Sequence, residues 1–89
     1  MKVHDIEDLT NSNIIRLAEV LEKNEEILFQ IRNKVFHVAK AGIEIYSVNV
    51  FNDEDLEDYD NLDFGFAVNA GMLYFKTSIE AIVLAKNNF

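Results

Sequence analysis

The sequence predicts one α+β domain, residues 1–89, in which an antiparallel sheet of three to five strands carries an N-terminal and a C-terminal helix on one face. Apolar residues recur with helical spacing near both ends of the chain, and between the ends they alternate with the period of a strand. A chain of 89 residues has room for a single core. We expect the order helix, three strands, acidic segment, one or two strands, helix.

The first helix is expected at residues 12–23. Its apolar side chains follow the i, i+3, i+4, i+7 spacing of a helix that packs one face on a core: Ile14, Leu17, Ala18 and Leu21. Ser12 or Asn11 would cap its N-terminus, and Asn24 would end it in the left-handed conformation. Residues 1–11 carry an apolar residue at every third position from Val3, which allows either a short helical turn or an extended lead-in.

Three antiparallel strands joined by tight turns follow the helix, at residues 27–31, 35–39 and 43–51. Asn33 and Lys34 would form the first turn. The second turn lies at residues 40–42, where Gly42 would supply a positive φ. The polar and apolar faces of the last strand exchange near Ser47, which predicts a bulge or a bend there.

The second half of the chain begins with an acidic segment, defined here as residues 53–63. Leu56, Tyr59 and Leu62 recur every three residues within it. This spacing is compatible with a short helix that lays one narrow apolar stripe on the core. Residues 64–75 are again strand-like, as one strand or as two with a turn at residues 69–71.

A C-terminal helix closes the domain. Thr77 and Glu80 have the spacing of a capping box at its start. The helix is expected to end at Asn87 and Asn88 and to direct three apolar side chains toward the core: Ile79, Ile82 and Val83.

The net charge of −8 is concentrated in the acidic segment. The segment holds seven acids and no base: Asp53, Glu54, Asp55, Glu57, Asp58, Asp60 and Asp63. The whole chain has 16 acids and 8 bases, so the remainder has 9 acids against 8 bases. Seven charges on eleven residues come to one per about 2.4 Å in a helix or about 5 Å in an extended chain, against one per about 3.4 Å along a DNA strand. The segment therefore approximates a phosphate backbone in linear charge density.

Composition and charge exclude several classes of function. No Cys is present, which removes disulfides, thiolate metal sites and cysteine nucleophiles. The negative net charge argues against direct nucleic-acid binding, because that needs a basic surface over the phosphates. The acidic start of the chain and apolar runs of only three to five residues predict neither a signal peptide nor a membrane span. We therefore expect a cytoplasmic protein with no membrane contact.

The candidate nucleophiles and bases form no catalytic motif. No Ser or Thr lies in a G-x-S-x-G or S-x-x-K context. His37, between Phe36 and Val38, is expected to be a core or sheet-face histidine with its hydrogen bonds satisfied, and His4 to be solvated. We expect no enzyme activity and no cofactor.

Calcium is a second chemical reading of the acidic segment, because Ca²⁺ binds several carboxylate oxygens on a tight loop. An EF-hand loop has Gly at its sixth position and Glu at its twelfth. A loop starting at Asp53 would place Asp58 and Phe64 there, and a loop starting at Asp58 would place Asp63 and Asn69 there. Neither register fits, so we expect no specific metal site.

The acidic segment therefore predicts a small protein-binding or inhibitor domain that docks on a basic partner, for example a nuclease or another nucleic-acid-binding protein. Its charge would steer it onto a Lys/Arg groove, as a nucleic-acid mimic does. In size, acidity and α/β make-up, but in no motif, the chain is similar to small phage-encoded anti-CRISPR and anti-restriction inhibitors. The same physics covers antitoxins and immunity proteins. The expected contacts are the seven acids of the segment, with Tyr59 as an aromatic anchor.

The alternative is a self-associating structural or accessory module in which the acidic segment serves only solubility. A homodimer would then form by pairing of an unprotected, β-branched strand edge, at residues 43–51 or 35–39.

Overall fold

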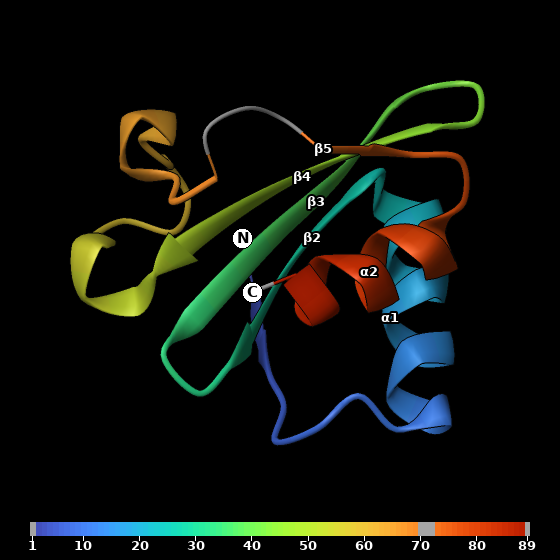
Figure 1. The fold of residues 1–89 in the computed structure, drawn as a ribbon, viewed down its shortest axis with the longest axis horizontal. Coiled ribbons are helices and arrows are strands. Elements are labelled where there is room, and N and C mark those ends of the chain that lie inside the picture. The colour runs from blue at the N-terminus through green and yellow to red at the C-terminus, as the bar shows by residue number, and fades with distance from the viewer. Residues whose placement is uncertain (1, 70–72, 89) are drawn as a thin grey trace.

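The computed structural model describes residues 2–69 and 73–88. It confirms the α+β fold, with one sheet and two α-helices (Figure 1). The helices are α1 (Asn11–Asn24) and α2 (Ser78–Asn88). The strands are β1 (Val3–Asp5), β2 (Glu26–Ile31), β3 (Lys34–Gly42), β4 (Ile45–Asn52) and β5 (Leu73–Phe75). Two short 3-10 turns lie between β4 and β5, at Asp53–Asp55 and Phe64–Phe66.

The five strands are ordered in space as they are in the chain, β1-β2-β3-β4-β5. All neighbours are antiparallel except β1, which pairs parallel to β2. The N-terminal lead-in is therefore an extended edge strand, the second of the two alternatives that its sequence allowed. Val3 lies beside Leu28 on one face of the sheet, and the chain then places Ile6 in the core on the other.

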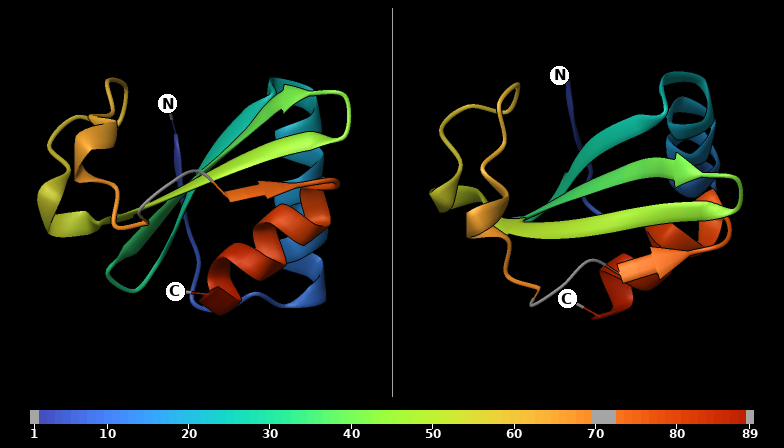
Figure 2. Two further views of the ribbon diagram at one scale, coloured as in Figure 1. Left: turned by 45° about the horizontal axis from the view of Figure 1, so that its top comes forward. Right: turned by 90° about the horizontal axis from the view of Figure 1, so that it is seen from above.

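Both helices pack on one face of the sheet, and residues 56–67, which follow β4, pack on the opposite face (Figure 2). The main core forms between the sheet and the helices, and the rings of Phe29 and Phe36 stack within it with centroids 4.9 Å apart. Its fully buried side chains come from both layers: Leu17, Leu21, Phe29, Val38, Val48, Val50, Ala81, Ile82 and Ala85. Residues at alternate positions on β2, β3 and β4 face the other way.

The boundaries of α1 differ from the sequence expectation by one or two residues. The N-cap is Thr10, whose Oγ1 accepts a hydrogen bond from the Asn13 amide at 3.2 Å, and not Asn11 or Ser12. The left-handed residue at the C-terminus is Glu25, with φ of 68°, rather than Asn24. Glu25 is held there from both sides, because its amide donates to the Leu21 carbonyl and its own carbonyl accepts from Lys40.

The turn between β3 and β4 also differs from the prediction. β3 continues through Gly42, so the turn falls at residues 43–44. Glu44 takes the positive φ, 56°, that was expected for Gly42. The irregularity in strand pairing lies between Lys40 and Gly42 on β3, whereas the bulge had been expected near Ser47 on β4. The expected turn between β2 and β3 is shifted by one residue, to Arg32 and Asn33.

The second half of the chain contains less regular structure than its sequence suggests. The acidic segment is not a helix: it is one 3-10 turn followed by irregular backbone. Residues 64–66 form a second 3-10 turn, so only β5 remains of the expected strands, and the expected turn at 69–71 lies largely outside the described residues. The capping prediction for α2 is confirmed by the Glu80 amide, which donates to Thr77 Oγ1 at 3.1 Å. On that helix Ile82 is buried, but Ile79 is exposed.

Candidate interaction surface

The acidic segment lies over the sheet face opposite the helices. A small second core forms there around Leu28, Val35 and Phe51, all three of them fully buried. Four partly buried residues from the segment and its continuation pack against it: Leu56, Tyr59, Leu62 and Ala67. The three-residue spacing thus identified the inward-facing positions correctly, although the backbone between them is not helical.

The acids between these inward positions face outward. Six of the seven carboxylate residues are exposed, and Asp53 is half-buried. Asp53 Oδ2 accepts a hydrogen bond from Gln30 Nε2 at 3.1 Å, which ties the start of the segment to β2. The segment therefore presents its charge on the outer surface of a backbone that is anchored to the sheet at three apolar positions, Leu56, Tyr59 and Leu62.

Five of the seven acids fall into two groups by what their carboxylates do locally. Asp58 and Asp63 cap their own turns, because their Oδ1 atoms each accept an amide hydrogen bond at 2.9 Å, from Asp60 and Gly65 respectively. In the described part of the chain the carboxylates of three acids make no hydrogen bond or ion pair: Glu54, Asp55 and Glu57. These three are free to contact a partner without loss of local structure.

Tyr59, the expected anchor, is half-buried against the second core, and its contact with a partner stays a prediction. The aromatic side chains that are most exposed next to the segment are Phe64 and Phe66, at 47% and 52% of their surface. The sequence places both beside Asp63, so their proximity to the charge was visible, but not their exposure. Phe51 was a third aromatic neighbour in the sequence, and it is fully buried.

His37 lies on β3 beneath the end of this surface. Its ring meets that of Phe64 edge to face, with centroids 5.5 Å apart, and its Nε2 lies 3.6 Å from Glu26 Oε2. Burial lowers the pKa of His37 from its ordinary value, and the Glu26 carboxylate only partly opposes this. His37 is thus a sheet-face histidine, as expected. We also expected its hydrogen bonds to be satisfied, but its Nδ1 is buried without a hydrogen-bond partner among the described residues.

Asn69 contributes to this surface in a way that its sequence context did not indicate. Its Oδ1 accepts from the Val50 amide at 3.0 Å and its Nδ2 donates to the Val48 carbonyl at 3.1 Å. One residue earlier, the Val68 amide donates to the Val50 carbonyl at 2.7 Å. The side chain therefore occupies hydrogen-bonding positions of a strand beside β4, which fixes the C-terminal end of the loop that carries the acids.

The strand edges that could have paired with a second copy are occupied. β3 lies between β2 and β4, and its residues 34–39 pair with both. The free side of β4 is covered by β5 at residues 46–48 and by residues 68 and 69 next to it. Residues 35–39, and residues 46–48 and 50 of the second expected edge, are therefore already paired within the domain, whereas self-association through another surface stays a prediction.

Neither a metal centre nor a membrane segment is found in the described ranges. Among residues 2–69 and 73–88 no three His, Asp or Glu side chains lie in a group that could hold a metal ion. Neither helix in these ranges is long and apolar enough to cross a membrane. No family model, curated protein or solved structure matches the chain.

Proposed function

We propose that this domain binds a partner protein through its acidic segment, which docks on a basic, nucleic-acid-binding surface of that partner. The observation that supports the proposal is the arrangement of residues 53–63, whose apolar positions pack on the sheet while most of their carboxylates face solvent. A charged stretch that only kept the protein soluble would not need to be packed against the core. An anchored one keeps its charges in place for a partner.

Electrostatics supply the reason why the partner would be basic. Seven of the chain's 16 acids lie in eleven residues, while the rest of the chain is nearly neutral. Such a one-sided field accelerates association with a cationic surface and repels nucleic acid itself. A Lys/Arg groove that binds phosphates fits this field, so a nuclease or a similar cytoplasmic nucleic-acid-handling protein is the partner class that we propose, with the domain as its inhibitor.

The three carboxylates without local partners define the variant that tests this function. The changes Glu54→Gln, Asp55→Asn and Glu57→Gln remove three charges and no hydrogen bond of the described fold. A matched control removes three exposed acids elsewhere: Glu19→Gln, Glu25→Gln and Glu44→Gln. Both variants change the net charge from −8 to −5, so they differ only in where the charge is lost.

The experiment is a pull-down from lysate of the source cells at low and moderate salt, with retained proteins identified by mass spectrometry. We expect the unaltered domain and the control to retain the same basic protein, and the segment variant to lose it. Added duplex DNA should release that protein, because it competes for the same groove, and higher salt should weaken retention because it screens exposed charges. Equal retention by both variants, or retention that DNA leaves unchanged, would contradict the proposal.

A further inference from the structure

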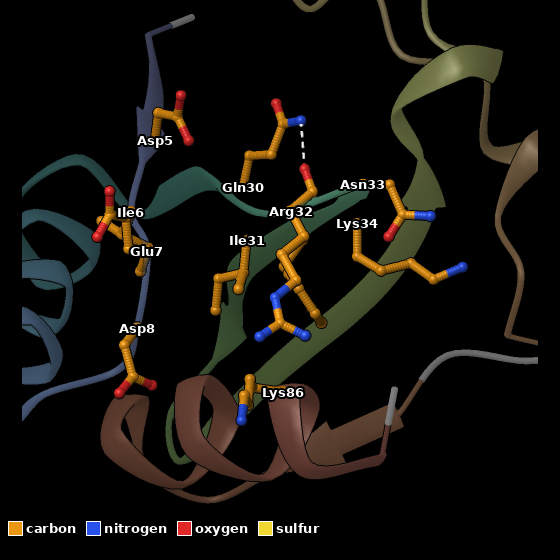
Figure 3. Close-up of a pocket in the computed structure, with 11 residues that line it drawn as sticks. Asp5, Ile6, Glu7, Asp8, Gln30, Ile31, Arg32, Asn33, Lys34 and Lys86 are labelled. Carbon is orange, nitrogen blue, oxygen red and sulfur yellow. Dashed lines mark hydrogen bonds between the residues drawn. The ribbon is translucent and has the colours of Figure 1, made fainter.

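A cavity of about 960 Å³ opens on the helix-covered face of the sheet, at the end where the acidic segment begins but on the opposite side of the sheet from it (Figure 3). It is bounded by the chain between β1 and α1, by the turn between β2 and β3, and by the last turn of α2. Apolar side chains that are otherwise buried contribute to its lining, namely Ile6, Ile31 and Phe36. The volume falls within the range of about 300–1,000 Å³ that is typical of small-molecule sites.

The charged residues of this cavity are separated by sign. Three acids come from the end of β1 and the segment that follows it, namely Asp5, Glu7 and Asp8. Three bases come from the opposite side, namely Arg32 and Lys34 at the β2–β3 turn and Lys86 on α2. Among the described residues the ion pairs lie elsewhere, between Lys40 and Glu22 and between His37 and Glu26. The two charged sides of the cavity therefore do not neutralise each other.

Arg32 is the best-positioned base. It occupies the turn with a left-handed φ of 57°, a conformation that is unfavourable for a residue other than glycine. The turn is held by Gln30, whose Nε2 donates to the Arg32 carbonyl at 2.8 Å. Figure 3 shows the Arg32 guanidinium directed toward Lys86, whereas Lys34 points away and donates to Asn52 Oδ1. Arg32 and Lys86 thus leave two cations, both without an ion-pair partner in the described chain, on one side of the cavity.

Asp5 and Glu7 are the corresponding acids on the other side. The Asp8 carboxylate already has a partner in its own loop, because its Oδ1 accepts a hydrogen bond from the Leu9 amide at 2.8 Å. Asp5 and Glu7 are exposed and make no ion pair with another described residue. The backbone that carries them is fixed to β2 by the Ile6 amide, which donates to the Gln30 carbonyl at 3.0 Å.

We propose that this cavity binds a small zwitterion of about the size of a dipeptide. Its carboxylate would lie between Arg32 and Lys86, its ammonium group against Asp5 and Glu7, and an apolar side chain over Ile31 and Phe36. A purely anionic ligand would face the acids, and a purely cationic one would face the bases, so a ligand with both charges is favoured over either. This cavity lies on the opposite face of the sheet from the acidic segment, and the proposal does not rest on the binding of a partner protein there.

The test compares one dipeptide with its own blocked forms. Leucyl-leucine, its N-acetyl form, its C-terminal amide and the doubly blocked form are titrated into isotope-labelled protein and followed by NMR. We expect saturable amide shifts at Arg32, Asn33 and Lys86 with the free dipeptide, with a Kd on the order of 1 mM. Each single block should weaken binding about fivefold, and the double block should abolish saturation.

Paired variants assign each ligand charge to one side of the cavity. Arg32→Gln with Lys86→Gln should make the protein bind the free dipeptide and its amide equally. Asp5→Asn with Glu7→Gln should make it bind the free dipeptide and the acetylated form equally. Such cross-comparisons isolate the pairwise contacts. The control, Arg16→Gln with Lys23→Gln, removes two exposed bases of α1 and should leave all four titrations unchanged.

Two outcomes would overturn this inference. One is the absence of saturable shifts with the free dipeptide up to about 20 mM, far above the expected Kd. The other is equal affinity for the free and doubly blocked forms, which would show that only the apolar side chains of the cavity bind the ligand and that its charged side chains do not. Neither outcome depends on a variant that folds, because the ligand alone is changed.

Discussion

His37 on β3 and Asn49 on β4 are direct register partners on the sheet face beneath the end of the acidic surface. They expose only 7% and 5% of their surface, and His37 Nδ1 and Asn49 Nδ2 both lack a hydrogen-bond partner in the described part of the chain. An unsatisfied buried polar group costs about 1–3 kcal/mol. The second core is therefore less stable at this pair than at its apolar end, where Leu28 and Val35 meet Phe51.

The free energy of unfolding should decrease as the pH falls below about 6.5. Burial lowers the pKa of His37 in the folded state, so the unfolded state binds more protons in this range. The stability contributed by the neutral imidazole is complete above the unfolded-state pKa and is lost as the pH falls from there toward the folded-state pKa. Urea unfolding at pH 7.5, 6.5 and 5.5 measures the slope of the free energy of unfolding against pH.

His37→Leu should flatten that slope and cost little stability at pH 7.5, because it replaces an unsatisfied polar ring by an apolar side chain. His4 also has a pKa lowered by burial, and it is only half-buried, so His4→Asn should remove a smaller part of the slope. An unchanged slope in the His37 variant would refute the assignment.

Tyr46 and Glu22 should be energetically coupled. The Tyr46 hydroxyl donates a hydrogen bond to the Glu22 carboxylate, which raises the pKa of Tyr46 to about 12 and lowers that of Glu22. We expect Tyr46→Phe to cost about 1 kcal/mol, at the low end for a hydrogen bond to a charged group because Glu22 is exposed. A double-mutant cycle with Glu22→Ala, which removes the acceptor, gives the coupling, and additive losses would show that the bond contributes nothing.

Replacing Asn69 should loosen the end of the acidic loop. Asn69→Ala leaves the Val50 amide and the Val48 carbonyl without their side-chain partner, which we expect to cost about 1–3 kcal/mol. Hydrogen exchange at the Val50 amide should accelerate by at least the corresponding factor of about five. Asn69→Asp keeps the acceptor for Val50 and should restore most of the protection of that amide.

Tyr59 should contribute to stability whether or not it contacts a partner. Tyr59→Ala removes a half-buried ring from the second core, for which we expect a loss of about 2 kcal/mol. Ile43→Ala is the matched control, because Ile43 is 90% exposed at the β3–β4 turn and its loss should stay within about 0.5 kcal/mol. Similar losses in the two urea titrations would mean that the segment is not anchored through Tyr59.

The sequence predicted what depends on periodic burial. The spacing of Leu17 and Leu21 identified the buried side of α1, and both side chains lie in the main core. The interval from Leu56 to Tyr59 and Leu62 likewise identified which positions pack inward, because burial is required there whatever the backbone does. Fold class and the direction of side chains are therefore readable from patterns of apolar residues.

Features set by contacts distant in the chain were not readable. Val3 belongs to an edge strand only because β2 offers a free side, and no local pattern distinguishes it from a helical turn. Glu25 and Glu44 take left-handed conformations that favour Gly or Asn, since the flanking strands fix where each turn must fall. Within the candidate surface, the position of the charge was predicted from the sequence. That the Asp58 carboxylate caps a turn while the Glu57 carboxylate makes no local hydrogen bond depends on turn geometry, which the sequence does not show.

The strand order β1-β2-β3-β4-β5 also bears on how the domain forms. Each strand pairs only with strands that are its neighbours in the chain. The β2–β3 and β3–β4 connections are tight turns, whereas α1 lies between β1 and β2 and the acidic segment lies between β4 and β5. Folding rates rise as contacts become more local. We expect the sheet to assemble progressively from its N-terminal side, even as the chain leaves the ribosome, with α2 completing the core last.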